Sequence, residues 1–297
     1  TNLSPIAKQA CAIVSTIRAS ERKTIWTTAS SPEIQKAELF PGMMFNTAKT
    51  HMETTRLWKI VQKMPKGALL HCHLGAMVDL RWVFNAALEE NGMCVCAAEP
   101  LTTSEAREKA GMRFQYVKAP SENAASIWTQ EYSPNEWVPV TVAADSFPDG
   151  GRDGWVSWMQ DRCSITQAES LQHHLGVDDV WKKLNSAFTI LPGIVYYEPI
   201  LRKFLREFFR ALLEDGVRWL EFRTAPFSRF LLEGQEEDDG NPEHLLRVLW
   251  EEVEAFKKNE EGKGFWGIRM IWVGLRIWDT DKVIEGNIPT SLMLSVY

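Results

Sequence analysis

Apolar residues follow two different periods along this chain, and these periods separate helical from extended segments. In the first part, apolar side chains recur every three or four residues, and the same pattern returns between Met52 and Met64. This spacing is typical of amphipathic helices, and Pro41-Gly42 separates the two helical stretches. Residues 1–64 are therefore predicted to form an N-terminal helical extension. The first helix is carried by Ile6, Ala10, Ile13, Val14 and Ile17.

Three short apolar runs, over residues 68–74, 217–223 and 267–274, are predicted to be strands. The first run follows the turn Pro65-Lys66-Gly67 and is nearly all apolar. A short apolar run without alternation is typical of a strand that is buried on both faces.

Amphipathic segments lie between these strands, over residues 79–90, 177–191, 198–215 and 242–256. Gly216 is expected to end the third helix, and Asn241 to cap the fourth, with Pro242 at its first position. Strands that alternate with helices indicate a parallel α/β architecture, and both a barrel and a doubly wound sheet fit this pattern. No GxGxxG motif or P-loop follows a strand, which counts against the nucleotide-cofactor folds.

The character of the chain changes over about residues 93–165, where Pro, Ser, Asn, Asp and Gly are frequent and no long period appears. We interpret this stretch as an insertion that forms a surface subdomain with a strand or two of its own. The acidic stretch 234–243 is interpreted as a solvated loop.

Charge and cysteine content narrow the class of protein. The net charge is −6 and no run of Lys or Arg suggests a basic face, so we expect no nucleic-acid partner. No apolar run approaches the roughly 20 residues that cross a bilayer, so we expect no membrane span. Five cysteines, an odd number, argue against a fully disulfide-bonded framework. One bridge, from Cys163 to either Cys94 or Cys96, remains open as an alternative.

His71 and His73 are the candidate metal ligands. Side chains two positions apart on a strand point to the same face, so the two imidazoles should project together while Leu70, Cys72 and Leu74 pack on the other side. Two neutral imidazoles on one rigid strand suit Zn²⁺. Two histidines that meet by chance are the alternative, but burying both rings without partners would be costly.

Four segments, in this order, resemble the adenosine deaminase family of the metal-dependent amidohydrolase superfamily. The first of them is most similar to the adenosine deaminase-related growth factor branch. The segments are MPKGALLHCHLGAMVD (64–79), DVWKKLNSAFTILPGIVYYEPILRKFL (179–205), GVRWLEFRTAP (216–226) and FWGIRMIWVGLR (265–276).

The resemblance implies a TIM-type (β/α)8 barrel with one Zn²⁺ at the carboxyl ends of its strands. It implies hydrolytic deamination of adenosine to inosine, with His71 and His73 as zinc ligands. Only about three strands of such a barrel are expected here, over residues 65–285, and residues 286–297 form an atypical tail. The family's later motifs (HAGE, Gly-His-Gly and Ser-Asp-Asp) do not occur in this sequence. We therefore expect a truncated chain that is incomplete and inactive and that has no catalytic residue of its own.

Several further residues also have both a functional and a structural interpretation. By resemblance, Trp181 lines the nucleoside pocket, and a core Trp on a helix face is the alternative. Leu74 and Gly75 stand where related deaminases commonly place a carboxylate that contacts the ribose. Glu221 and Arg223 point to one face of their strand, and we expect a buried salt bridge between them rather than a substrate contact. His173-His174 and His244 are expected to be solvated or structural.

Two other functions remain open. One is a different purine amidohydrolase, such as an adenine or AMP deaminase. The other is a non-catalytic, growth-factor-like binding protein that forms a homodimer through the N-terminal helices. The growth-factor branch implies secretion, whereas the odd cysteine count fits a cytoplasmic protein.

Overall fold

The computed structural model of the chain describes residues 2–26, 45–121, 123–170, 176–224 and 229–273. The chain divides into two units. The first comprises residues 1–65 and 165–176, and the second comprises residues 66–164 and 177–297. Pro41-Gly42 and the tail 286–297 lie outside the described residues.

The first unit is helical, as its apolar period predicts. Its helices are α1 (Pro5–Thr24), α2 (Phe45–Met52), α3 (Arg56–Lys63) and the short α8 (Gln167–Ser170). Glu21 of α1 is buried, and its Oε1 accepts hydrogen bonds from the backbone N–H groups of Arg56 (2.6 Å) and Leu57 (3.2 Å). A carboxylate at a helix N-terminus satisfies amides that have no partner within the helix. Glu21 therefore ties α1 to the first turn of α3.

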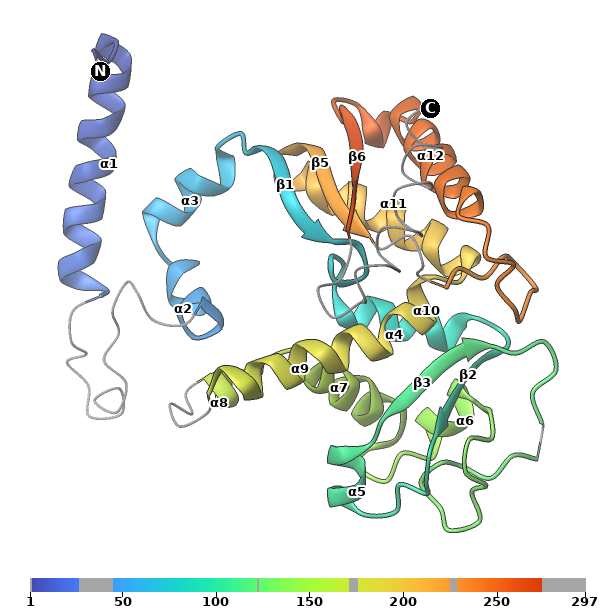
Figure 1. The fold of residues 1–297 in the computed structure, drawn as a ribbon. Coiled ribbons are helices and arrows are strands. Elements are labelled where there is room, and N and C mark those ends of the chain that lie inside the picture. The colour runs from blue at the N-terminus through green and yellow to red at the C-terminus, as the bar shows by residue number, and fades with distance from the viewer. Residues whose placement is uncertain (1, 27–44, 122, 171–175, 225–228, 274–297) are drawn as a thin grey trace. The chain divides into compact units, whose positions relative to one another are not determined.

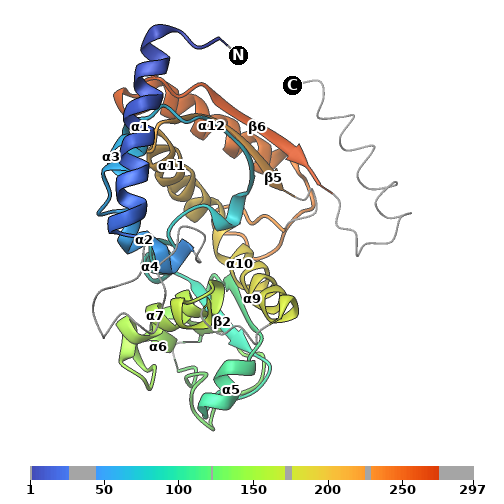
Figure 2. The ribbon, with the colours of Figure 1, turned by 90° about the vertical axis from the view of Figure 1, so that its left-hand side faces the viewer.

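The second unit contains a parallel sheet with the strand order β1-β5-β6. Its strands are β1 (Gly67–His73), β5 (Val217–Thr224) and β6 (Gly267–Trp272). Two long helices, α11 (Glu198–Glu214) and α12 (Glu243–Lys258), lie along one side of the strands (Figures 1 and 2). The predicted parallel α/β architecture with three strands is confirmed. These strands form an open sheet, and no closed barrel occurs within the described ranges.

Aromatic packing holds the helices to the sheet. Leu220 and Phe222 of β5 are almost fully buried. Behind them, the Phe209 ring lies 5.5 Å from that of Phe256 and 5.0 Å from that of Phe265, measured between ring centroids. Each such buried side chain stabilises the fold by about 1.5–3 kcal/mol. Gly216 adopts a left-handed φ of 83° and ends α11 where the sequence predicts its end.

A second, antiparallel sheet has the order β3-β2-β4, from β2 (Met93–Ala97), β3 (Met112–Tyr116) and β4 (Val138–Pro139). The remaining helices of this unit are α4 (Leu80–Glu89), α5 (Ser104–Lys109), α6 (Val140–Asp145), α7 (Gly151–Cys163), α9 (Val177–Ile190) and α10 (Pro192–Val195). Two 3₁₀ turns complete it, η1 (Leu74–Ala76) and η2 (Glu260–Gly262). The strands expected within the stretch 93–165 are present as β2, β3 and β4. That this stretch forms a surface subdomain stays a prediction, and the buried side chains of both sheets belong to one hydrophobic core.

Further expectations concerned the cysteines, the start of α12 and membrane-spanning helices. All five cysteines are free thiols, so the bridge from Cys163 to Cys94 or Cys96 that the sequence left open as an alternative does not form. Burial raises the pKa of Cys94 to about 12, which keeps that thiol protonated. Helix α12 begins one residue later than predicted, with Pro242 at the N-cap and the Asn241 Oδ1 accepting from the Glu243 N–H at 3.0 Å. In the described part of the chain, no helix is long and apolar enough to span a bilayer.

An ion-pair network joins α11 to α12 through one buried carboxylate. Glu252 is 3% exposed, and its oxygens lie 3.0 Å from Arg202 Nη1 and 2.6 Å from Arg206 Nε. Its neighbour Glu251 also contacts Arg202, with Oε2 2.7 Å from Nη2, but its side chain is far more exposed. The two carboxylates thus share a cation and differ mainly in burial.

We expect Glu252→Ala to lower the free energy of unfolding by about 2–4 kcal/mol, because it leaves guanidinium groups beside a buried position without their carboxylate. The matched control Glu251→Ala removes a solvent-exposed partner of the same arginine and should cost at most about 1 kcal/mol. Urea denaturation followed by circular dichroism measures both changes. Equal losses in the two variants would show that burial of the network does not matter.

Candidate functional site

Strand β1 carries a bulge that decides which side chains face away from the helices. Leu69 pairs with Leu220 and Cys72 pairs with Phe222, so three steps on β1 stand opposite two steps on β5. Such a bulge adds one residue and shifts the alternation of side chains that follows it. Leu70 and His71 are consequently both exposed, although they are adjacent.

The bulge corrects the expectation that β1 is buried on both faces. Cys72 and Leu74 are buried against the core, as predicted. Leu70 is 57% exposed, so its predicted packing on the same side as Cys72 is wrong. The strand thus has one buried face and one open face, and the open face carries both histidines.

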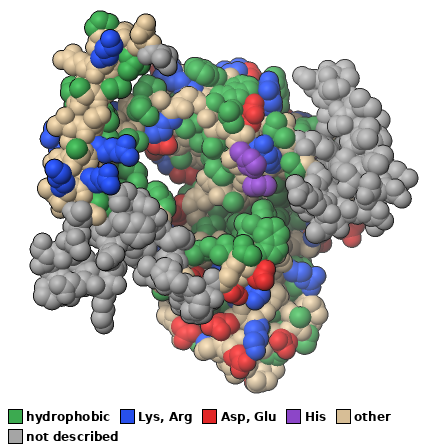
Figure 3. Space-filling view, turned by 60° about the vertical axis from the view of Figure 1, so that its left-hand side comes forward, with side chains coloured by type: hydrophobic (Ala, Val, Ile, Leu, Met, Phe, Trp, Pro, Cys, Tyr) green, Lys and Arg blue, Asp and Glu red, His purple; other side chains and the backbone are tan. Residues whose placement is uncertain are grey.

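The two imidazoles lie side by side near the carboxyl end of β1. The ring centroids of His71 and His73 are 5.7 Å apart, with the ring planes inclined by 55°. Histidine side chains are visible on the open face in Figure 3, next to a group of hydrophobic side chains. This is the candidate metal site, and active sites of barrel enzymes lie at the same end of the strands.

The surroundings keep His73 neutral. Partial burial lowers the pKa of His73 below its usual 6.5, and the nearby His71 and Arg223 lower it further. A neutral imidazole nitrogen is the form that binds metal ions. On the opposite face, burial raises the pKa of Cys72 to about 11, and its Sγ donates to the Glu221 carbonyl oxygen at 3.8 Å. Burial thus disfavours the thiolate of Cys72, which is the form of cysteine that binds metal ions.

The histidine pair fits part of a zinc shell. Zn–N bonds are about 2.0–2.1 Å long, so one ion can join two rings that stand this close. Four-coordinate zinc needs further ligands. Among the residues that the structure describes, no cluster of three or more His, Cys, Asp or Glu side chains can hold a metal ion. If zinc binds here, His71 and His73 would supply two positions of such a shell.

Helix α9 forms an apolar wall that reaches the histidines. The Phe188 ring meets the His73 ring edge-on, with centroids 5.7 Å apart. Trp181 and Leu184 lie further along the same helix at helical spacing, and Trp181 is 59% exposed. The alternative that Trp181 is a core residue is therefore wrong, and its contact with a nucleoside remains a prediction. Phe188 lies at the helical spacing that the sequence predicts. No pattern in the sequence predicts its contact with His73.

The polar residues of the open face pair differently from the prediction. Glu221 Oε1 lies 3.3 Å from Arg269 Nη1 on the next strand, so the expected partner Arg223 is wrong. Arg223 Nη1 instead donates to the Leu70 carbonyl oxygen at 3.1 Å. His244 is structural, as expected, since its Nε2 lies 2.9 Å from Asp239 Oδ2. His173-His174 lies outside the described residues.

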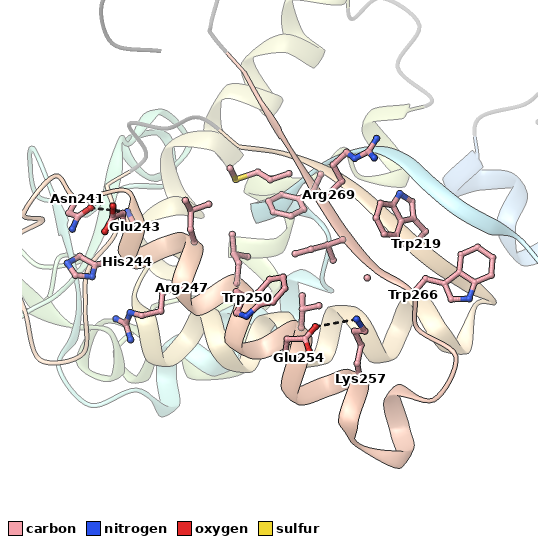
Figure 4. A pocket seen from close by; sticks show the side chains of 17 residues that line it. Trp219, Asn241, Glu243, His244, Arg247, Trp250, Glu254, Lys257, Trp266 and Arg269 are labelled. Carbon is pink, nitrogen blue, oxygen red and sulfur yellow. Dashed lines mark hydrogen bonds and ion pairs between the residues drawn. The ribbon is translucent and has the colours of Figure 1, made fainter. Parts of the chain in front are cut away.

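A groove of about 1170 Å³ lies elsewhere, between β6 and α12. Figure 4 shows Trp250 and Arg247 projecting from α12 on one side, and Trp219, Trp266 and Arg269 on the other. The histidine pair does not line this groove. Among the described strands, β6 is at the edge of the sheet beside this groove.

Comparison with known proteins identifies similar chains over most of this sequence. No family model matches the chain. An adenosine deaminase of Lutzomyia longipalpis is 25% identical over 231 residues, which are 77% of this chain and 40% of that protein. Adenosine deaminase 2-A of Danio rerio is 25% identical over 81% of this chain and 43% of its own length. Adenosine deaminase 2 of Homo sapiens is 23% identical over 90% of this chain and 48% of its own length.

These relatives confirm the predicted resemblance to the adenosine deaminase family. The chain spans less than half the length of each of these three proteins.

The lowered pKa of His73 predicts a pH-dependent stability. Where the unfolded chain binds a proton that the folded chain does not, the free energy of unfolding rises with pH. We therefore expect stability to fall as pH drops below the ordinary value of 6.5 towards the lowered pKa of the folded state. His73→Gln should flatten this part of the profile. Urea denaturation at a series of pH values, with a chelator present in all samples, measures the slopes; parallel profiles would contradict the shift.

Proposed function

We propose that this chain carries the metal-binding first strand of a zinc-dependent adenosine deaminase, with His71 and His73 as two zinc ligands. The observation that carries the proposal is the pair of neighbouring imidazoles on the open face of β1, 5.7 Å apart. Imidazole nitrogens on one strand suit zinc, and the relatives that match this chain are named adenosine deaminases. Bound zinc would supply a hydroxide near neutral pH by lowering the pKa of its water.

The substrate class follows from the wall beside the histidines. Trp181 and Phe188 belong to an apolar stripe of α9, and Phe188 touches His73. A flat purine base can stack on or against such aromatic rings. We therefore propose adenosine or a related purine nucleoside as the ligand, with Trp181 as a binding residue.

The acid–base chemistry lies outside this set of residues. General acid–base catalysis needs a positioned group of suitable pKa beside the reacting atom. The family's HAGE glutamate has no counterpart in residues 1–297, nor do the Gly-His-Gly and Ser-Asp-Asp motifs. We propose that these residues by themselves bind metal without completing the deamination.

Zinc binding tests the proposal directly. We expect the purified chain to take up Zn²⁺, and His71→Ala or His73→Ala to weaken binding at least about tenfold, because even indirect partners of a metal often contribute 10- to 100-fold. His244→Ala is the matched control, since His244 is held by Asp239 in another part of the unit. Competition with a chromophoric chelator measures the affinities.

Equal affinities in the wild type and both alanine variants would refute the zinc site. The same samples are also assayed for deaminase activity, which is measured by the change in ultraviolet absorbance when adenosine becomes inosine. We expect no turnover above that of the buffer. Turnover by this chain that depends on His71 and His73 would keep the zinc site and refute the proposed inactivity.

A second candidate function, binding of another copy through the N-terminal helices, rests on α1. Ile17 and Glu21 of α1 are buried, whereas Ile6 and Ile13 lie on the exposed surface of the same helix, and Leu3, just before it, is exposed as well. An exposed apolar stripe on a helix is typical of a protein interface. We propose a homodimer through this stripe as the alternative to a purely catalytic lineage.

The double variant Ile6→Glu/Ile13→Glu should lower the dimer fraction, because it places charges within the apolar stripe. Gln9→Glu/Thr16→Glu adds the same charges at exposed polar positions of α1 and serves as the control. Sedimentation equilibrium at several protein concentrations measures the association constant. A wild-type chain that remains monomeric at every concentration would rule out this interface.

A further inference from the structure

The extra residue in the β1 bulge leaves a backbone carbonyl outside the regular ladder between β1 and β5. In this bulge the register passes from Leu69–Leu220 to Cys72–Phe222. An added residue at a bulge interrupts the ladder of backbone hydrogen bonds. The carbonyl oxygen of Leu70 lies within this interruption, and it accepts a hydrogen bond from Arg223 Nη1 at 3.1 Å.

Arg223 is well placed to hold this point. It lies on β5 directly beside His73, since the two residues are Cα partners in the parallel pairing. Its side chain reaches back along β1 to Leu70, and so it spans the segment that contains both histidines. A guanidinium is a rigid, always charged donor, and its hydrogen bond to a carbonyl is stronger than one from a neutral donor.

The bulge determines the direction of both imidazoles. Before it, Ala68 and Leu70 are exposed; after it, His71 and His73 are exposed. Strict alternation would place residues 69, 71 and 73 on one face. Leu69 packs against the core and so does Cys72, three residues later, so a regular strand would turn one of these two residues away from the core; with the bulge both stay packed against the core and both histidines are exposed.

We infer that Arg223 is a positioning residue for the histidine pair: by holding the Leu70 carbonyl it stabilises the bulge that presents both rings on the open face. The inference deepens the proposed zinc site, because it names the residue that fixes the relative placement of the two ligands. Arg269, on the neighbouring strand, provides a contrast. It pairs with Glu221 and lies over the Trp219 ring, so its contacts join β5 and β6 instead of β1.

The first test measures the proximity of the two imidazole rings in the absence of metal. In the full chain with isotope-labelled histidine rings, a nuclear Overhauser cross-peak should join His71 and His73 in the presence of a chelator. Arg223→Met keeps the aliphatic length and removes the donors, so the cross-peak should be lost or strongly weakened. Arg269→Met, the matched control, should keep it. Arg223→Lys, which retains a charged donor without the planar fork, should restore part of the signal.

The second test measures the zinc affinity of the same variants. We expect Arg223→Met to weaken Zn²⁺ binding roughly 10- to 100-fold, as for other residues that orient metal ligands, and Arg269→Met to change it less than about twofold, because it touches neither histidine. Circular dichroism establishes that each variant is folded. Should Arg223→Met not fold, Arg223→Gln, whose shorter side chain removes the charge, is measured in its place.

The two measurements distinguish the positioning role of Arg223 from the proposed zinc site. A cross-peak that depends on Arg223 in a chain that binds no zinc would support the positioning role and refute the metal site. A cross-peak of unchanged strength in the folded Arg223 variants would overturn the positioning role, whatever the zinc affinity. Equal loss in the Arg269 control would also overturn it, because the effect would then belong to the sheet as a whole.

Discussion

Burial of one face of the parallel sheet against α11 and α12 is the constraint from which the other features of the site follow. Leu220 and Phe222 of β5 pack into an aromatic layer that includes Phe209 and Phe256. Since side chains alternate along a strand, fixing this face also fixes which residues of β5 lie on the other one. Glu221 and Arg223 are thereby directed away from the helices, to the side on which β1 presents its histidines.

On β1 the same constraint meets a sequence whose core-facing residues do not alternate strictly. Leu69 packs against the core, and so do Cys72 and Leu74. These three cannot share one face of a regular strand, because Leu69 is an odd number of residues from Cys72. The extra residue at Leu70–His71 resolves the conflict. Apolar burial on both sides thus favours the bulge, and the hydrogen bond from Arg223 to the Leu70 carbonyl oxygen lies within it.

How much of this was predictable depends on how local the cause is. The helices and the three parallel strands follow from periods and end signals within single segments, such as Gly216 after α11. The second sheet does not, because Cys94 pairs with Gln115 on one side and Pro139 on the other, and nothing near Cys94 encodes those partners. The ion pairs of Glu221 and Glu252 likewise join different elements. The HxH spacing identified the candidate ligands, but their exposure depends on register, which a one-residue change inverts.

The histidine pair also shows how far one strand can build a metal site. Two imidazole rings that are two residues apart on one strand can be oriented by that strand and by one neighbouring strand. Here the neighbouring strand is β5. Orientation alone leaves the remaining zinc positions open, and zinc that lacks a closed shell of ligands is held weakly. The described residues supply no third acidic, thiol or imidazole group beside the pair. Any high-affinity site must therefore draw its other ligands from residues beyond those described. In the proposed site, β1 and β5 would contribute the imidazoles of His71 and His73, which lie side by side before any other ligand is added.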